Sequence, residues 1–128
     1  MTREHFAPLT VHKPIGAYSP AVRVGNVIFV SGQIPLQPDG RVVSPADPRG
    51  QAVQCFENLR NVLDAAGASL RDVVKITTFS THHAHRQVMG EVRREFLEPP
   101  YPASTSVIVT SLAEPEYLFE IEAVAILE

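Results

Sequence analysis

Short apolar runs and one longer helical stripe follow each other along the first half of the chain. Val22–Val24 and Val27–Val30 flank Gly25-Asn26, a pair that tolerates the positive φ angles of a two-residue turn, so the pattern predicts a β-hairpin. Further on, apolar residues recur at steps of three and four, which predicts a helix over residues 48–66 with Asp47 as its N-cap. The apolar residues of this stripe are Ala52, Phe56, Leu59, Leu63 and Ala66.

The second half predicts a strand rich in β-branched residues, an amphipathic helix and two more strands. In order, these segments are residues 73–80, 84–97, 104–112 and 117–127. The resulting order is β-β-α-β-α-β-β, which predicts one α+β domain over residues 1–128, with both helices on one face of a single sheet. The opposite face would then need cover, which predicts a homo-oligomer.

Composition narrows the class of protein. The 128 residues carry a net charge of −3 with no basic run, which argues against nucleic-acid and membrane partners. Cys55 is the only cysteine, so an intrachain disulfide is excluded and the residue is expected to serve packing. No apolar run approaches the ~20 residues that span a membrane, and the first residues lack an apolar leader segment. We therefore expect a cytoplasmic protein.

Five sequence blocks, spread over most of the chain, carry a resemblance to a known family. They are Pro14–Ala21, Val30–Pro35, Ala65–Lys75, Tyr101–Ala103 and Glu120–Ala123. As a set, they resemble the reactive intermediate deaminase family, also called RidA or YjgF. The resemblance implies a chorismate-mutase-like subunit, a homotrimer and ligand clefts between neighbouring subunits. It also implies hydrolysis of imines and enamines to ketoacids and ammonia, without a metal or other cofactor.

The resemblance assigns a role to several residues. Glu120 corresponds to the family's water-positioning glutamate, while Tyr18, Ser31 and Gly32 correspond to residues that line the ligand. The alternatives are a sheet carboxylate satisfied by its neighbours, a packed tyrosine and an ordinary turn. Glu122 lies two residues after Glu120 in the same strand, so both should share a face about 7 Å apart, and one pKa should be raised. We expect Glu122 to serve structural pairing.

One family residue is missing. The family pattern Pro-Ala-Arg-Ser reads Pro102-Ala103-Ser104-Thr105 here, so Ser104 replaces the arginine that grips the substrate carboxylate. Losing a charge-assisted contact of roughly 1.5–3 kcal/mol should weaken binding of 2-imino acids at least tenfold. Ser104 and Ser106 then bind a neutral or larger ligand, or form a row of hydroxyls that faces solvent.

Other polar residues near the predicted cleft are weaker candidates for ligand binding. Arg93 and Arg94 carry guanidinium groups, but they share a helix with Glu91 and Glu95, so we expect solvated ion pairs. Gly90 stands where the family often has an asparagine.

The histidines His82, His83 and His85 form the remaining cluster. Without a partnering Cys/Asp pattern they do not predict a zinc site, and we expect a solvated loop, with a proton donor at the cleft rim as the alternative.

The sequence thus favours a cofactor-free deaminase of imine or enamine intermediates with an altered substrate preference. The alternative is a ligand-binding or regulatory trimer without turnover. An RNA-cleaving protein is a third interpretation, which the acidic chain disfavours.

Overall fold

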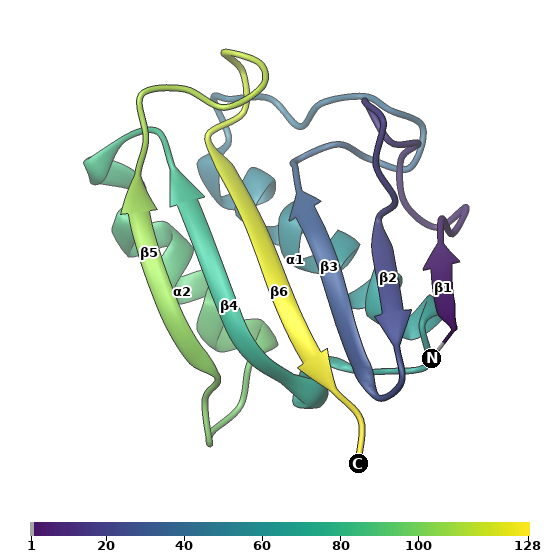
Figure 1. Ribbon diagram of the computed structural model, residues 1–128. Helices are drawn as coiled ribbons and strands as arrows, with labels where there is room; N and C mark the ends of the chain where they lie inside the picture. Colours follow the sequence, from purple (N-terminus) through teal and green to yellow (C-terminus); the bar gives the residue numbers. More distant parts are fainter. Residues whose placement is uncertain (1) are drawn as a thin grey trace.

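Two layers make up the part of the chain that the computed structural model describes, residues 2–128. A six-stranded sheet with the order β1-β2-β3-β6-β4-β5 forms one layer, and the helices α1 and α2 cover one of its faces (Figure 1). Neighbouring strands are antiparallel except β4 and β5, which are parallel. The elements are β1 Arg3–Phe6, β2 Ala21–Val24, β3 Val27–Gln33, α1 Pro48–Ala65, β4 Val73–Ser80, α2 Arg86–Phe96, β5 Ala103–Ile108 and β6 Phe119–Ile126.

The hairpin and the long helix are confirmed. Gly25 has a φ of 61° in the turn between β2 and β3, the conformation that its lack of a side chain permits. The Asp47 carboxylate accepts a hydrogen bond of 2.9 Å from the backbone N–H of Gly50 and so caps α1. The whole predicted apolar stripe of α1 is buried against the sheet, and Cys55 is buried with it, as expected for packing.

The predicted element order lacked one strand. Residues Arg3–Phe6 form the edge strand β1, which pairs with β2 only and is largely exposed, so it has no apolar alternation to mark it. The strand predicted over 104–112 ends at Ile108, because its partner β4 ends at Ser80. A 3-10 turn over His83–His85 precedes α2, which begins two residues later than predicted.

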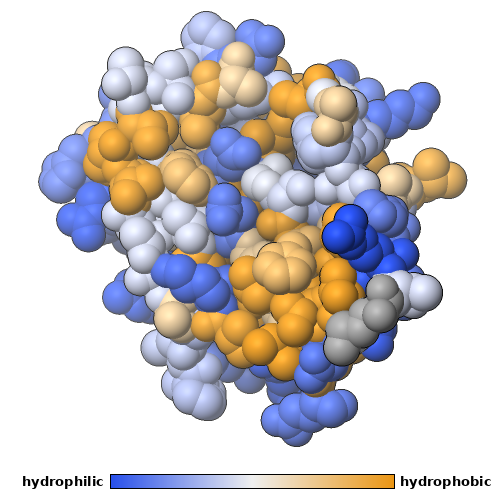
Figure 2. Space-filling view, viewed as in Figure 1, coloured by the Kyte–Doolittle hydropathy of each residue, from blue (hydrophilic) through white to orange (hydrophobic). Residues whose placement is uncertain are grey.

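The sheet face opposite the helices is open. Phe29 and Ile126 point from it and are 51% and 39% exposed. Figure 2 looks onto this face and shows apolar side chains gathered over part of it. The edge strand β5 is exposed along its entire length. Within residues 2–128, no helix has the length and apolar character that a bilayer crossing requires.

Candidate functional site

The Glu120 carboxylate lies directly against the backbone of Gly32. Gly32 sits where the pairing of β3 with β6 shifts register between Val30 and Gln33, and such irregularities re-aim the chain. A Cβ atom at position 32 would overlap the Glu120 carboxylate. Glycine at position 32 therefore makes room for the carboxylate to lie beside the strand.

Backbone contacts fix the residues around this carboxylate. The Ser31 hydroxyl donates to the carbonyl of Ser19 at 2.6 Å, which ties β3 to the segment that precedes β2. The Tyr18 hydroxyl accepts a hydrogen bond of 3.3 Å from the N–H of Ile15. Together they border a surface hollow of about 260 Å³, which we call the Glu120 hollow. Its lining residues are Ile15, Tyr18, Ser31, Gly32, Ile34, Ala113 and Glu120.

The pKa of Glu120 is raised, the direction expected from the sequence for one of the two glutamates. Burial raises the pKa of Glu120, and the negative charge of Glu122 raises it further. Within residues 2–128, neither carboxylate has a hydrogen-bond or ion-pair partner. The structural pairing expected of Glu122 is thus not found in these residues, and Glu120 keeps a free, half-buried carboxylate.

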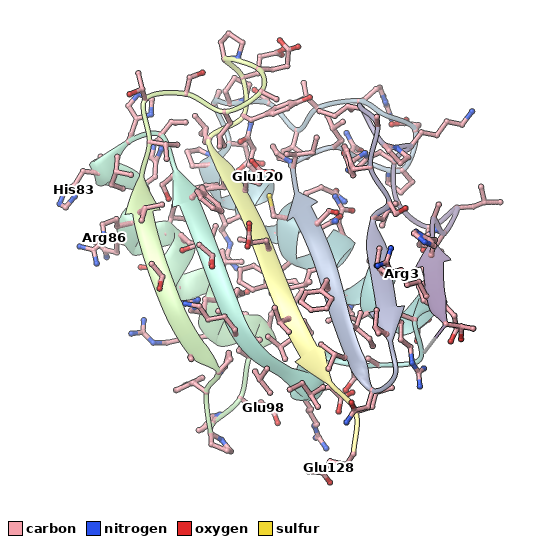
Figure 3. The ribbon with its side chains drawn as sticks, viewed as in Figure 1. Arg3, His83, Arg86, Glu98, Glu120 and Glu128 are labelled. Atoms are coloured by element: carbon pink, nitrogen blue, oxygen red, sulfur yellow. The ribbon has the colours of Figure 1, made fainter. Side chains whose placement is uncertain are left out.

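Ser104 and Ser106 lie on the other face of the sheet. The Ser106 hydroxyl is 2.8 Å from the Thr78 hydroxyl, and Thr78 is buried beneath the helices. Glu120 pairs instead with Phe79, the next residue of β4, and side chains alternate between faces along a strand. Figure 3 shows Glu120 near the start of β6, away from Arg86 on α2. A single chain therefore separates the predicted site residues into two groups.

The expectation that Arg93 is a solvated ion-pair partner is wrong. Its Nη2 atom donates a hydrogen bond of 2.8 Å to the Ser104 hydroxyl, across from α2 to β5. Glu95 pairs with Arg49 of α1 instead. Arg93 is half-buried, burial lowers the pKa of its guanidinium, and its Nε atom is buried without a hydrogen-bond partner among residues 2–128. The charge therefore lies next to Ser104, the residue that the sequence comparison with the family pattern predicts to stand in place of an arginine.

Two surface hollows share Gly90 and Arg93, and we call them the Arg93 hollows. One extends past Tyr101 and Ser104, and the other past Ser106. A Cβ atom at Gly90 would meet nothing within 4 Å, so the missing side chain leaves open space there. The remaining lining residues are Thr78, Ser80, Arg86, Met89, Arg94, Leu97, Pro102, Val107 and Ile108.

Comparison with known proteins identifies the family. The sequence profile of the family described as endoribonuclease L-PSP matches residues 10–127. The chain belongs to this family. It is 42% identical to a RutC family protein of Pyrococcus abyssi over 88% of each chain. It is 35% identical to the 2-iminobutanoate/2-iminopropanoate deaminase of Dermatophagoides farinae, over 91% of this chain and 90% of the relative.

Solved structures of the L-PSP family have the same fold. The RidA structure from the Antarctic bacterium Psychrobacter superposes with a TM-score of 0.92 at 34% identity, over 97% of this chain and 99% of the other. Escherichia coli TdcF with bound serine superposes with a TM-score of 0.91 at 31% identity, over 98% and 99%. The α+β architecture is therefore that of the family.

In this L-PSP family member, His85 departs from the solvated loop that the sequence predicts for the histidine cluster. The rings of His82 and His85 are 5.3 Å apart, and His85 also packs edge-on against Phe119 at 5.9 Å. Burial lowers the pKa of His85 and its Nδ1 atom has no partner within residues 2–128, whereas His82 and His83 are exposed. No group of three metal-binding side chains is found in that same range.

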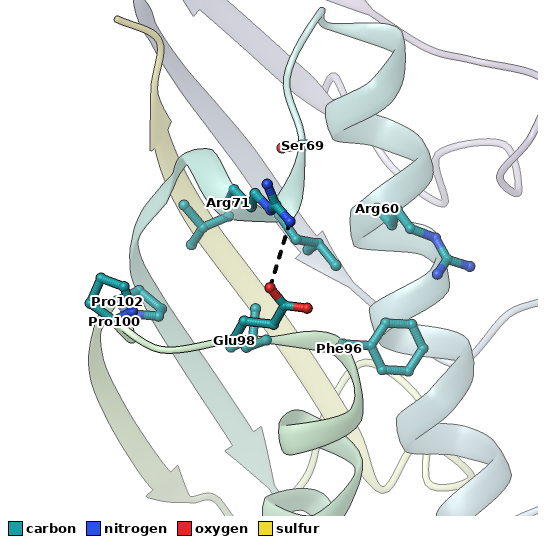
Figure 4. A pocket seen from close by; sticks show the side chains of 10 residues that line it. Arg60, Ser69, Arg71, Phe96, Glu98, Pro100 and Pro102 are labelled. Carbon is teal, nitrogen blue, oxygen red and sulfur yellow. Dashed lines mark ion pairs between the residues drawn. The ribbon is translucent and has the colours of Figure 1, made fainter.

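A separate hollow lies at the end of α2 (Figure 4). Arg71 and Glu98 pair across it at 3.7 Å, and both side chains are exposed. The Arg60 guanidinium lies over the Phe96 ring at 5.3 Å. Because its charged groups face each other or an aromatic ring, and no predicted site residue lines it, this hollow offers no comparable chemistry.

Sequence reasoning missed two residues that hold the loops around the Glu120 hollow. Gln51 of α1 donates to the carbonyls of Val43 and Glu116 and accepts from the N–H of Leu118, all at 2.8 Å. Asn58 donates to the carbonyls of Ile34 and Leu36 at 3.0 and 2.9 Å. Both are polar residues on the buried side of α1. A polar residue at a buried position of a helix needs hydrogen-bond partners, and this is the sequence feature that could have identified them.

Proposed function

We propose that this L-PSP family protein is a homotrimer that hydrolyses imines or enamines in clefts between neighbouring chains. The observation that carries the proposal is the half-buried Glu120 carboxylate, which has no partner within residues 2–128 and is held against Gly32 in a surface hollow. Relatives named as RidA and as a 2-iminobutanoate/2-iminopropanoate deaminase support the reaction class.

The separation of the site residues supports a cleft shared by two chains. Glu120, Tyr18, Ser31 and Gly32 lie at one hollow, whereas Ser104 and Ser106 lie on the opposite face, along the exposed edge strand β5. If β5 of one chain packs beside the Glu120 hollow of the next, both groups border the same ligand. The apolar residues on the open sheet face would be covered in such a trimer, as the resemblance implies.

Glu120 would act as the base that activates water. The carbon of a protonated imine is already electrophilic, so the attacking water needs only to be oriented and to lose a proton to the carboxylate. The new C–O bond gives a carbinolamine. Return of the proton to nitrogen, followed by cleavage of the C–N bond, releases ammonia and leaves the ketone. The pKa raised by burial makes Glu120 a better proton acceptor than an exposed glutamate.

The substrate preference would differ from that of relatives that carry an arginine on β5. A serine at position 104 has no charge, so a contact to the carboxylate from this position is weaker by roughly 1.5–3 kcal/mol. Short 2-imino acids should therefore bind at least tenfold more weakly to this position. Neutral imines, which make no charged contact at this position, should be affected less.

The test is ammonia release from freshly generated 2-iminopropionate and from bulkier imino acids. We expect turnover by the wild type and a loss of about 100-fold or more in Glu120→Ala, since general bases contribute 10²–10⁴-fold. A partly buried glutamate of α1 that does not line the hollow, Glu57, gives the matched control, and Glu57→Ala should keep full activity.

The alternative is a trimer that binds a small molecule without turnover. It is favoured by the same loss of the β5 arginine, and it predicts an inert wild type that still binds a ligand. Turnover that requires Glu120 would exclude this alternative. Light scattering tests the assembly in parallel, because a monomer in solution leaves the two groups of residues apart and contradicts the proposal.

A further inference from the structure

Arg93 is a half-buried cation that forms no ion pair with a carboxylate of residues 2–128. The acidic residues nearest in sequence are engaged elsewhere: Glu95 pairs with Arg49 at 2.6 Å, and Glu91 accepts from Gln87. Burial is the cause of the lowered pKa of Arg93, with no contribution from an acidic group. A guanidinium that is withdrawn from water without a negative partner is unfavourable unless a ligand supplies the charge.

The surroundings of Arg93 are suited to an anion. Both Arg93 hollows are lined by hydroxyl, apolar and arginine side chains, and neither is lined by an acidic residue. Arg94 borders one of them and Arg86 the other, which adds positive charge. Hydrogen-bond donors without acidic competitors favour a carboxylate, and a guanidinium offers it a planar pair of N–H groups.

The position of Arg93 is set by two neighbours. Ser104 accepts a hydrogen bond from Nη2, which orients the guanidinium toward β5 and leaves its Nε–H without a partner among residues 2–128. Gly90, one helical turn before Arg93, leaves open space beside it. A larger residue at position 104 would occupy the place that the guanidinium now takes, so the small serine and the helical arginine fit together.

We propose that Arg93, oriented by Ser104, binds the carboxylate of the substrate in the shared cleft. The inference rests on the proposed function and deepens it, because it names the group that selects the substrate. The charge comes from α2 rather than β5, and the space at Gly90 lies beside it. The carboxylate is therefore drawn toward α2, and acids with a bulkier carbon skeleton than 2-iminopropionate are favoured.

The first experiment measures kcat and KM of Arg93→Gln and Arg93→Lys with carboxylate-bearing imines. Glutamine keeps a donor for Ser104 without the charge, so KM should rise about tenfold or more while kcat changes much less, the pattern of lost ground-state binding. Lysine keeps the charge without the planar fork and should give an intermediate KM. A neutral imine without a carboxylate should respond to neither variant. Unchanged KM values for the carboxylate substrates in Arg93→Gln would overturn the proposal.

Arg71→Gln is the matched control. Arg71 is an exposed arginine that pairs with Glu98 at the separate hollow, so its loss should leave KM unchanged. Thermal unfolding of both variants checks that the fold is kept. A rise in KM for the neutral imine equal to that for the acids would show a merely structural role for Arg93 and would also overturn the proposal.

A binding measurement separates this inference from the proposed function. Calorimetry with a stable product analogue, 4-methyl-2-oxopentanoate, needs no turnover. Binding by the wild type and at least tenfold weaker binding by Arg93→Gln support the anion site even if no imine is hydrolysed, in which case only the deaminase proposal fails. Equal binding by both proteins overturns the role of Arg93 even if hydrolysis depends on Glu120.

The double variant Arg93→Gln/Ser104→Arg moves the charge from the helix to the strand. We expect it to regain binding of short acids, 2-oxobutanoate for example, more than that of 4-methyl-2-oxopentanoate. Ser104→Arg alone places two guanidinium groups in one space. It should therefore bind these acids less well than the double variant, and it should be less stable to thermal unfolding. No recovery of short-acid binding in the double variant would contradict the exchange of one arginine for the other.

Discussion

The Glu120 hollow and the Arg93 hollows are built from different kinds of element. Glu120 lies on β6 in the middle of the sheet and contacts the backbone of Gly32, so its position is fixed by pairing on both sides. Arg93 lies on a helix and reaches a serine of the exposed edge strand β5. The group proposed for chemistry is therefore held by the interior of the fold, whereas the group proposed for recognition sits where side chains can change with little effect on the core.

Gly32→Ala, at the Glu120 hollow, should have the largest effect on the rate of ammonia release. A methyl group at position 32 overlaps the Glu120 carboxylate, whose flexible end can move aside, so the fold should persist while the base is displaced. A displacement of about 1 Å lowers rates by about 100-fold. Ammonia release and thermal unfolding, measured on the same preparation, check both parts. An unchanged kcat would show that the carboxylate is not held by this contact.

Gly90→Ala is the corresponding change beside Arg93. The new Cβ meets nothing within 4 Å, and alanine is favoured over glycine inside a helix by about 1 kcal/mol, so unfolding in urea should show a gain of about that size. The space for bulky substrates shrinks, so KM should rise more for 4-methyl-2-iminopentanoate than for 2-iminopropionate. A loss of stability would show that the space at Gly90 is filled in the assembled protein.

Glu122→Gln should have the smallest effect, on the pH profile of kcat. Its negative charge raises the pKa of Glu120, so its removal lowers that pKa. The base must be ionised to accept a proton, and the acid limb of the profile should therefore move to lower pH. A limb that moves to higher pH would contradict the assignment of Glu120 as the base.

Most of the fold follows from patterns within single elements. The buried stripe of α1 and the β-branched run of β4 gave their bounds to within a residue, because each pattern repeats over several turns or alternations. The edge strand β1 was missed because its residues are polar and pair on one side only. The beginning of β6 was placed two residues early, because Leu118 donates to the side chain of Gln51 instead of to a strand.

The site was less predictable, since it depends on contacts between elements. Strand geometry places Glu120 and Glu122 on the same face of the sheet, and their closeness accounts for part of the raised pKa of Glu120. The pairing of Arg93 with Ser104 does not, because spacing along the helix pointed to Glu91 and Glu95 as partners. Only the packing of α1 beside α2 shows that Arg49 takes Glu95 and leaves Arg93 to β5.

The central claim is that the Glu120 and Arg93 regions of two different chains form one cleft. Mixed trimers test it most directly. Glu120→Ala and Arg93→Glu are each expected to be inactive with carboxylate substrates. When equal amounts are co-expressed or refolded together, random assembly gives about one quarter of clefts with both native groups, so about one quarter of wild-type activity should return. Activity no greater than the average of the two separate variants would contradict a cleft shared between chains.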